Sequence, residues 1–234
     1  MKFESELIKA TLIKRYKRFF VDAYLENGDI VTAHCPNTGS MKGLLQEGAE
    51  IWLSPATDPK RKLRYTLEMI QAPESLVGVH TGRPNKLVQE AIEMGQLNTH
   101  FPDWHHLKTE QKYGQNARID ILLEDAAQRK CFIEVKNVTL REQNTALFPD
   151  AVTSRGAKHL AALSAESQKG HRAVMFYLVQ RQDCQNFSAA ANIDPFYAAE
   201  LHKAMQAGVE VFAYSCDLNP HQGITMNKQL PVDI

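Results

Sequence analysis

The sequence predicts an α+β protein made of two parts with different rhythms. Short runs of β-branched and aromatic residues, separated by turn formers, fill most of residues 1–82. From residue 83 onward, amphipathic helical patterns alternate with apolar strand patterns in the order αβββαβαβ. At 234 residues and 44% hydrophobic, the chain is long enough for two modest cores. We therefore expect one domain over residues 1–82 and a second, with a mixed sheet, over residues 83–234.

Six strand-like runs make up the first part. Asn27-Gly28 lies between the second and third runs, and Asn-Gly between apolar runs is a strong β-hairpin signal. So many short strands suit a small closed barrel, and an OB-like barrel is the natural candidate because such barrels bind oligonucleotides. Other small barrels and half-sandwiches would give the same pattern. The runs cover residues 7–15, 18–25, 29–35, 50–54, 65–70 and 77–81.

The second part begins with a helix. Asn85 is its expected N-cap and Met94 its approximate end, and Glu90 flanks its apolar stripe. Strand-like runs follow at 107–114, 118–124 and 131–138, then a helix at about 153–168. The continuous apolar run 172–180 suits a strand covered on both faces. Asp194 and Pro195 begin a third helix that Gly208 ends, and residues 209–216 form the last expected strand.

The run 131–138, "CFIEVKNV", carries two charges inside an otherwise buried strand. Because side chains alternate across a strand, Glu134 and Lys136 share one face. The polar loop before this strand is centred near Ala127, so a hairpin folded there places Asp120 opposite Glu134. Paired carboxylates are preferred ligands of Mg²⁺ or Mn²⁺. A lysine beside the metal can stabilise negative charge at phosphorus or position an attacking water.

Other carboxylates and basic residues could complete such a site. Glu110, in the strand before Asp120, is a second candidate ligand. Arg155 and His159 are four residues apart in the second helix and could reach phosphates. The alternative reading is a solvated helix face, and Glu-x-Lys alone is common on solvated strand faces.

Basic clusters with aromatic neighbours in the first part suit a nucleic-acid backbone and its bases. In this first part of the chain, acidic residues are nearly as numerous as basic ones, and the whole chain has a formal net charge of zero. Binding of nucleic acid therefore requires the basic residues to gather on one face. The segment "HCPNTGSM" could form an Asx turn with a small phosphate-binding nest, and the alternative is a purely structural tight turn. The sequence places no histidine partner for Cys35. The candidate DNA contacts here are Lys14, Arg15, Arg18, Arg61 and Lys62.

Composition limits the cellular setting. The four cysteines are widely separated and indicate reduced thiols, not a disulfide framework or a zinc site. No apolar run is as long as a membrane span, and the first residues contain no hydrophobic signal region. We expect a cytoplasmic protein without a membrane partner.

Asp120 and Glu134-x-Lys136 across a hairpin, in an αβββαβ order, resemble the PD-(D/E)xK nuclease core. That resemblance implies that Asp120 and Glu134 bind Mg²⁺, that Lys136 is catalytic, and that Glu90 completes the metal site. Ile119 stands where the motif has proline. The blocks "RYKRF", "HCPNTGSM", "IEVKNVTL" and "FPDAVTSRGAKHL" resemble the sugar fermentation stimulation protein A family over nearly the whole chain. This second resemblance implies DNA binding without sequence preference and a link to the regulation of sugar utilisation.

The expected function is therefore DNA binding with a metal-dependent phosphodiesterase site. One alternative is a non-catalytic DNA-binding regulator that keeps the nuclease fold. Another is an enzyme acting on a small phosphorylated metabolite, although no Gly-rich phosphate loop is present. Whether two copies pair as a homodimer to cut both strands stays open.

Overall fold

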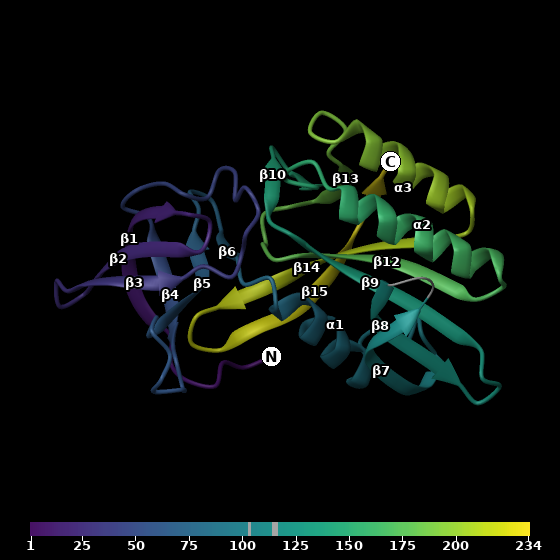
Figure 1. Cartoon of the computed structure of the whole chain (residues 1–234), viewed down its shortest axis with the longest axis horizontal. Helices are drawn as coiled ribbons and strands as arrows, with labels where there is room; N and C mark the ends of the chain where they lie inside the picture. The colour runs from purple at the N-terminus through teal and green to yellow at the C-terminus, as the bar shows by residue number, and fades with distance from the viewer. Residues whose placement is uncertain (103, 114–116) are drawn as a thin grey trace.

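The computed structural model describes residues 1–102, 104–113 and 117–234. A small β-barrel lies beside a larger sheet that carries helices on both faces (Figure 1). This arrangement confirms the predicted fold class. No helix in the described ranges is both long and apolar enough to cross a membrane.

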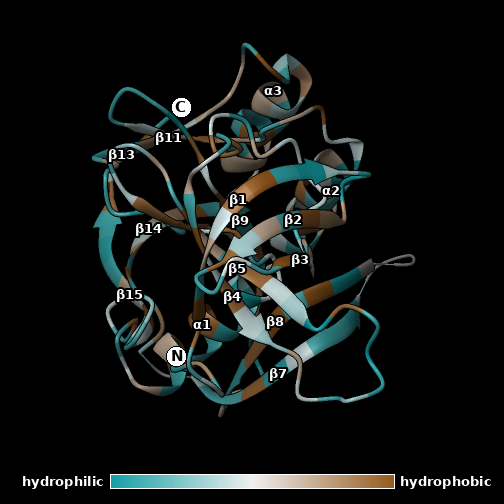
Figure 2. Cartoon of the chain, turned by 90° about the vertical axis from the view of Figure 1, so that its left-hand side faces the viewer, coloured by the Kyte–Doolittle hydropathy of each residue, from teal (hydrophilic) through white to brown (hydrophobic). Residues whose placement is uncertain are grey.

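The barrel is closed by its own strands. Its sheet order is β3-β2-β1-β4-β5-β6, and a parallel pairing of His34 with Thr66 joins β3 to β5, so five strands form the OB-like barrel. Alternate residues of β1 and β2 point inward and are buried. Figure 2 shows both hydrophobic and hydrophilic segments along the barrel strands. Gly28 has φ +90° in the β2–β3 turn, where glycine is favoured. The strands are β1 Ile8–Tyr16, β2 Phe20–Leu25, β3 Ile30–His34, β4 Glu50–Pro55, β5 Tyr65–Gln71 and β6 Leu76–Gly78.

The second domain is built on a mixed six-stranded sheet, with order β15-β14-β12-β9-β8-β7. β9, β12 and β14 are parallel, and the other pairings are antiparallel. One face carries α1, and the other carries α2 and α3 (Figure 1). The elements are α1 Arg83–Glu93, β7 Trp104–Tyr113, β8 Ala117–Asp125, β9 Lys130–Val138, α2 Ser154–Gln168, β12 Arg172–Val179, α3 Pro195–Gln206, β14 Glu210–Asn219 and β15 Gly223–Leu230.

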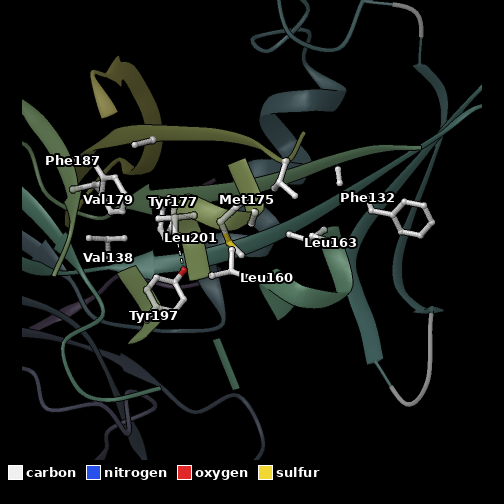
Figure 3. Packing of buried hydrophobic residues seen from close by; sticks show 14 of the residues in the cluster. Phe132, Val138, Leu160, Leu163, Met175, Tyr177, Val179, Phe187, Tyr197 and Leu201 are labelled. Carbon is white, nitrogen blue, oxygen red and sulfur yellow. Dashed lines mark hydrogen bonds between the residues drawn. The ribbon is translucent and has the colours of Figure 1, made fainter. Parts of the chain in front are cut away.

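The core of the second domain lies on both faces of β12. After Arg172, every residue of β12 is buried, as its continuous apolar sequence predicts. Under α2 and α3, the Tyr177 and Tyr197 hydroxyls are 2.5 Å apart, and aliphatic side chains surround them (Figure 3). The pairing satisfies two hydroxyls that would otherwise be buried without partners.

Several predictions of elements were wrong. The final strand does not end near residue 216, because β14 continues to Asn219 and a turn leads into β15. The pattern also missed β10 Leu140–Glu142, β11 Thr145–Phe148, β13 Asn186–Ala189 and β16 Val232–Asp233, which form a separate small sheet. Strands of two to four residues are too short to show alternation.

The expected N-cap of the first helix was also wrong. Gly82 occupies the N-cap, and Asn85 lies in the first turn behind Pro84. Proline is favoured in the first turn because its missing N–H has no partner there. Asn85 is therefore free of a capping role. The later helix starts agree with prediction, since the side chains of Thr153 and Asp194 cap α2 and α3.

The barrel and the second domain contact each other through a backbone hydrogen bond and an ion pair. The Gly78 amide donates to the Gln180 carbonyl at 2.9 Å. A Cβ atom on Gly78 would lie 2.6 Å from the Gln180 Oε1 atom, so only glycine fits this contact. Arg141 bridges Glu74 of the barrel side and Asp183 at 2.6 and 2.9 Å. Together these contacts hold the barrel against the carboxyl ends of β9 and β12.

Candidate nuclease site

A divergence of two strands, here called the fork, lies at the centre of the candidate site. The β8–β9 ladder has the predicted register and ends at the Ile121–Ile133 pair, with Asp120 and Glu134 at the next positions. Beyond this point β8 stays paired with β7, while β9 stays paired with β12. The Asp120 carboxylate accepts a hydrogen bond from the Val135 amide at 2.8 Å. The Asp120 side chain thus accepts from the Val135 amide, which no longer has a partner on the β8 backbone because the two strands have separated.

Glu134 is buried and connects β9 to α2. Its Oε1 atom accepts from the Lys136 ammonium at 2.5 Å and from His159 Nδ1. Arg155 Nε donates to His159 Nε2 at 3.2 Å, and the Lys136 ammonium lies 3.3 Å from His159 Nδ1. The Glu134 Oε2 atom has no hydrogen-bond partner in the described part of the chain. Burial would raise the pKa of Glu134, but the His159 hydrogen bond and the Lys136 charge outweigh it and lower that pKa.

Asp120 lies on β8, the other strand of the fork, and is affected by the negative charge of Glu134. Its Oδ1 atom accepts a hydrogen bond from Asn85 of α1 at 2.8 Å. Burial, followed by the negative charge of Glu134, raises the pKa of Asp120 to about 6, although the Val135 and Asn85 donors oppose the shift. A carboxylate has about four lone-pair sites, so Asp120 keeps acceptor capacity beyond these two bonds. Asp120, Glu134 and Lys136 are called the carboxylate cluster below.

Two predicted ligands are not brought to this cluster. Glu90 lies on α1 and pairs with the amino group of Met1 at 2.6 Å. Glu110 lies in β7 at φ +54°, and its side chain is exposed. Among residues 1–102, 104–113 and 117–234, no group of three or more His, Cys, Asp or Glu side chains is arranged to hold a metal. Two carboxylates and a lysine are therefore what the chain itself places at the fork.

Asn85 and Tyr113 are two neighbours of the cluster that the sequence did not reveal. The Tyr113 hydroxyl is buried without a described partner, and burial together with the charges of Glu134 and Asp120 raises its pKa. Nothing in the sequence distinguishes these residues from an ordinary helix-start asparagine and an ordinary core tyrosine. Only the convergence of β7 and α1 on the fork brings them to the carboxylates.

The basic residues of the β1–β2 turn stabilise a neighbouring loop. Arg15 donates to the Asn37 and Gly39 carbonyls at 2.8 and 3.0 Å, and Arg18 donates to the Thr38 carbonyl at 2.8 Å. These bonds fix the segment "HCPNTGSM" against the barrel. The guanidinium groups of Arg15 and Arg18 are therefore already hydrogen-bonded to backbone oxygens.

The remaining predicted DNA contacts are more open. Lys14 is exposed, lies 5.6 Å from the centre of the Tyr16 ring and is 3.8 Å from Asp22. Lys62 is exposed and has no described ion-pair or hydrogen-bond partner, whereas Arg61 is half-buried. Arg155 is exposed at the start of α2, beside the cluster. The barrel therefore offers Lys14 and Lys62 more freely than its arginines.

The "HCPNTGSM" loop forms the predicted Asx turn, in which Asn37 Oδ1 accepts from the Gly39 amide at 2.8 Å. The loop also reaches the second domain, because Ser40 donates to the Asp150 carboxylate at 3.0 Å. All four cysteines are free and buried, and burial raises the pKa of Cys35. A raised thiol pKa disfavours the nucleophilic thiolate.

Comparisons with known proteins agree with this two-part architecture. Family models described as "SfsA N-terminal OB domain" and "Sugar fermentation stimulation protein RE domain" match residues 13–79 and 82–222. A sugar fermentation stimulation protein homolog of Nitrosococcus oceani is 49% identical, with 100% of each chain covered. One from Paramagnetospirillum magneticum is 48% identical over 100% of this chain and 98% of the relative. The solved structure of Pyrococcus furiosus SfsA in complex with Ca²⁺ is similar with a TM-score of 0.90 and 25% identity, covering 100% of this chain and 98% of that one.

Proposed function

Because the chain belongs to the sugar fermentation stimulation protein family, we propose that it binds DNA without sequence preference and hydrolyses phosphodiester bonds at the carboxylate cluster. The buried Glu134 Oε2 atom carries this proposal, since it lacks a described partner and faces a second carboxylate. A buried anion pair is costly unless a cation or protons compensate it. A divalent cation would compensate both groups at once.

The residues at the fork fit Mg²⁺ or Mn²⁺. Asp120 and Glu134 would hold the ion, and water would fill much of its shell, as is common for Mg²⁺. When bound, the ion supplies Lewis-acid polarisation of a phosphate and a more acidic water. The relative from Pyrococcus furiosus was solved with Ca²⁺, which supports a divalent cation in this fold.

The chain's own side chains would orient the substrate. Lys136 lies 2.5 Å from Glu134 and would place its ammonium beside the scissile phosphate, where negative charge develops. Arg155 is exposed four residues before His159 and would contact a neighbouring phosphate. Lys14 and Lys62 would extend the phosphate path over the barrel. Such contacts carry no base information, which is consistent with binding independent of sequence.

A plasmid cleavage assay tests the proposal. Wild-type protein should cut DNA in Mg²⁺ or Mn²⁺ and not in EDTA, while Lys136→Met and Asp120→Asn should lose at least about a hundredfold in rate and still bind DNA. Lys158→Met is the matched control, because Lys158 is exposed on α2 and has no described contact with the cluster. Equal cutting by Lys136→Met and wild type would contradict the assignment.

A non-catalytic DNA-binding regulator is the second candidate. One observation favours it, namely that the described residues include no three-ligand metal group. Salt-sensitive DNA binding with no cutting under any divalent metal would support this alternative. Binding of a phosphorylated metabolite without any DNA retention would contradict both.

A further inference from the structure

A small pocket between the two domains, here called the junction pocket, lies at the carboxyl end of β9, the strand that carries Glu134 and Lys136. It measures about 210 Å³. Pockets for drug-sized ligands start at roughly 300 Å³, so this one suits a single planar ring system. Its walls come from the "HCPNTGSM" loop, the end of β9 and the β10–β11 region, and they comprise Asn37, Thr38, Gly39, Thr81, Asn137, Thr139, Leu140, Leu147, Phe148 and Asp150.

Two of the lining residues carry polar groups that no described protein atom uses. Asn37 and Thr139 are each only 5% exposed. Asn37 uses Oδ1 for the Gly39 amide, but its Nδ2 group makes no described hydrogen bond, and neither does the Thr139 hydroxyl. Neither atom is among the fully buried atoms of the described chain that lack a partner, so both are accessible from the pocket and can hydrogen-bond to a ligand that enters it.

The charges of the pocket restrict that ligand. None of its lining residues is lysine or arginine, and Asp150 contributes a carboxylate. A phosphate would meet a negative charge without compensation and is disfavoured. A neutral ring with donors and acceptors on its edge would satisfy the asparagine and threonine groups.

An apolar wall completes the fit to a ring. Leu140, Leu147 and Phe148 line this side. The Phe148 ring is held by Tyr177 and Tyr197, with centroids 5.5 and 5.2 Å away. Nucleobases are recognised by this combination of an apolar or aromatic surface for the ring face and hydrogen bonds for the edge.

The position of the pocket connects it with the carboxylate cluster. Asn137 directly follows Lys136 in β9, with its side chain on the other face of the strand. Thr139 lies three residues after Lys136, just beyond the end of β9 and about 10 Å along the chain at strand spacing. The segment from Asp150 leads within a few residues to Arg155 at the start of α2. A phosphate at Lys136 and a base in the pocket can therefore belong to the same or a neighbouring nucleotide.

We propose that the junction pocket accepts one unstacked nucleobase of a DNA strand whose phosphate lies at the carboxylate cluster. This inference rests on the proposed function and specifies its substrate class as DNA with unpaired or extruded bases. A base stacked inside an intact duplex cannot enter a pocket of this size, so single strands and distorted duplexes are favoured over regular duplexes.

Binding by the full chain in EDTA tests the pocket separately from cleavage. The probes are a short labelled single strand of mixed sequence and a strand of equal length that has abasic sites throughout, compared by fluorescence anisotropy. Wild-type protein should bind the base-bearing strand about tenfold more tightly. Thr38→Trp, which fills the pocket from an exposed position, should abolish this preference and leave binding of the abasic strand unchanged.

Two further variants sharpen the result. Thr139→Val keeps the shape of the side chain and removes its hydroxyl, so the base-bearing strand should bind about threefold to tenfold more weakly. Thr225→Trp is the matched control, because Thr225 is exposed on β15 and does not line the pocket. This control should retain the tenfold preference.

Other outcomes would overturn the inference. Equal affinity of the wild type for both strands overturns it while leaving the proposed DNA partner intact, and so does a preference that survives Thr38→Trp. A monosaccharide that binds wild type but not Thr38→Trp, without any effect of bases, would reassign the pocket to a small polar ligand. Failure to retain either strand would remove the proposed function itself.

Discussion

Around the fork, a residue that would position a metal ligand can be distinguished from the ligands themselves. Asn85 touches Asp120 and belongs to α1, so it would fix the carboxylate without contacting the substrate. Replacing such a supporting group typically weakens metal binding by about 10- to 100-fold. We predict that Asn85→Ala weakens Mn²⁺ binding by about tenfold in calorimetry. Gln89→Ala on the same helix, which removes only an exposed bond to Glu93, should have no effect. Unchanged affinity in Asn85→Ala would exclude a positioning role.

Basic residues of the barrel should divide into structural and DNA-contacting ones. We predict that Lys62→Ala reduces the slope of log affinity against log salt by about 0.9 without lowering the melting temperature, since it removes one phosphate contact. Arg15→Ala should lower the melting temperature and leave the salt slope unchanged, because Arg15 holds the Asn37 and Gly39 carbonyls. Salt titrations and thermal melts of both variants check this. A reduced slope with unchanged melting for Arg15→Ala would make Arg15 a DNA contact.

The facing positions of Asp120 and Glu134 could be predicted because a hairpin's register follows from the length of its loop. The partners of these residues could not. A helical pattern shows which residues lie on one face but not which strand that face meets, so Glu90 was expected at the metal site and Asn85 only at the helix N-cap. The structure pairs Glu90 with Met1 and Asn85 with Asp120.

At the scale of secondary-structure elements, Asp194 holds two helix starts together. Its Oδ1 atom accepts from the Tyr197 amide in α3 at 2.9 Å, and its Oδ2 atom accepts from the Thr153 amide before α2 at 2.8 Å. We predict that Asp194→Ala lowers the free energy of unfolding by about 2 kcal/mol, as expected for a lost cap plus a buried donor without a partner. Urea denaturation measures this.

The isosteric variant separates the two duties of Asp194. Asp194→Asn keeps an acceptor for Tyr197, but its amide nitrogen cannot accept from Thr153, so the loss should be intermediate. A variant as unstable as Asp194→Ala would show that the α3 cap contributes little.

Long elements could be predicted from the sequence and short ones could not. β12 and α3 carry eight or more residues with clear apolar runs or capping residues. β10, β11 and β13 have three or four residues each, too few to show alternation, and β11 and β13 pair although they are distant in sequence. Sequence periodicity cannot reveal partners of that kind.

At the scale of the whole molecule, a charged network holds the barrel to the second domain. Asp183 accepts hydrogen bonds from Arg181 and Arg141, and Arg141 also pairs with Glu74. Burial would raise the pKa of Asp183, but the arginines outweigh it and lower that pKa. A carboxyl group with a lowered pKa stabilises the fold at pH values above its ordinary pKa of about 4. This stabilisation is lost as the pH falls through the lowered pKa.

We predict that Asp183→Asn costs about 3 kcal/mol at pH 7, since it leaves buried Arg181 without its counter-charge. The difference from wild type should shrink as the pH falls below about 4. Urea midpoints from pH 3 to pH 7 check both statements. A difference that stays constant over this range would mean that the Asp183 charge is not what holds the junction.

The first residue pairs with a strand from the opposite end of the chain. Met1 exchanges two backbone hydrogen bonds with Ile224 of β15, at 2.8 and 3.0 Å. During translation the earliest part of a chain leaves the ribosome first. Barrel residues 8–78 can close while later residues are still being added, but Met1 gains these two backbone bonds only after β15 has emerged. Met1 is thus among the last residues to find its native partner.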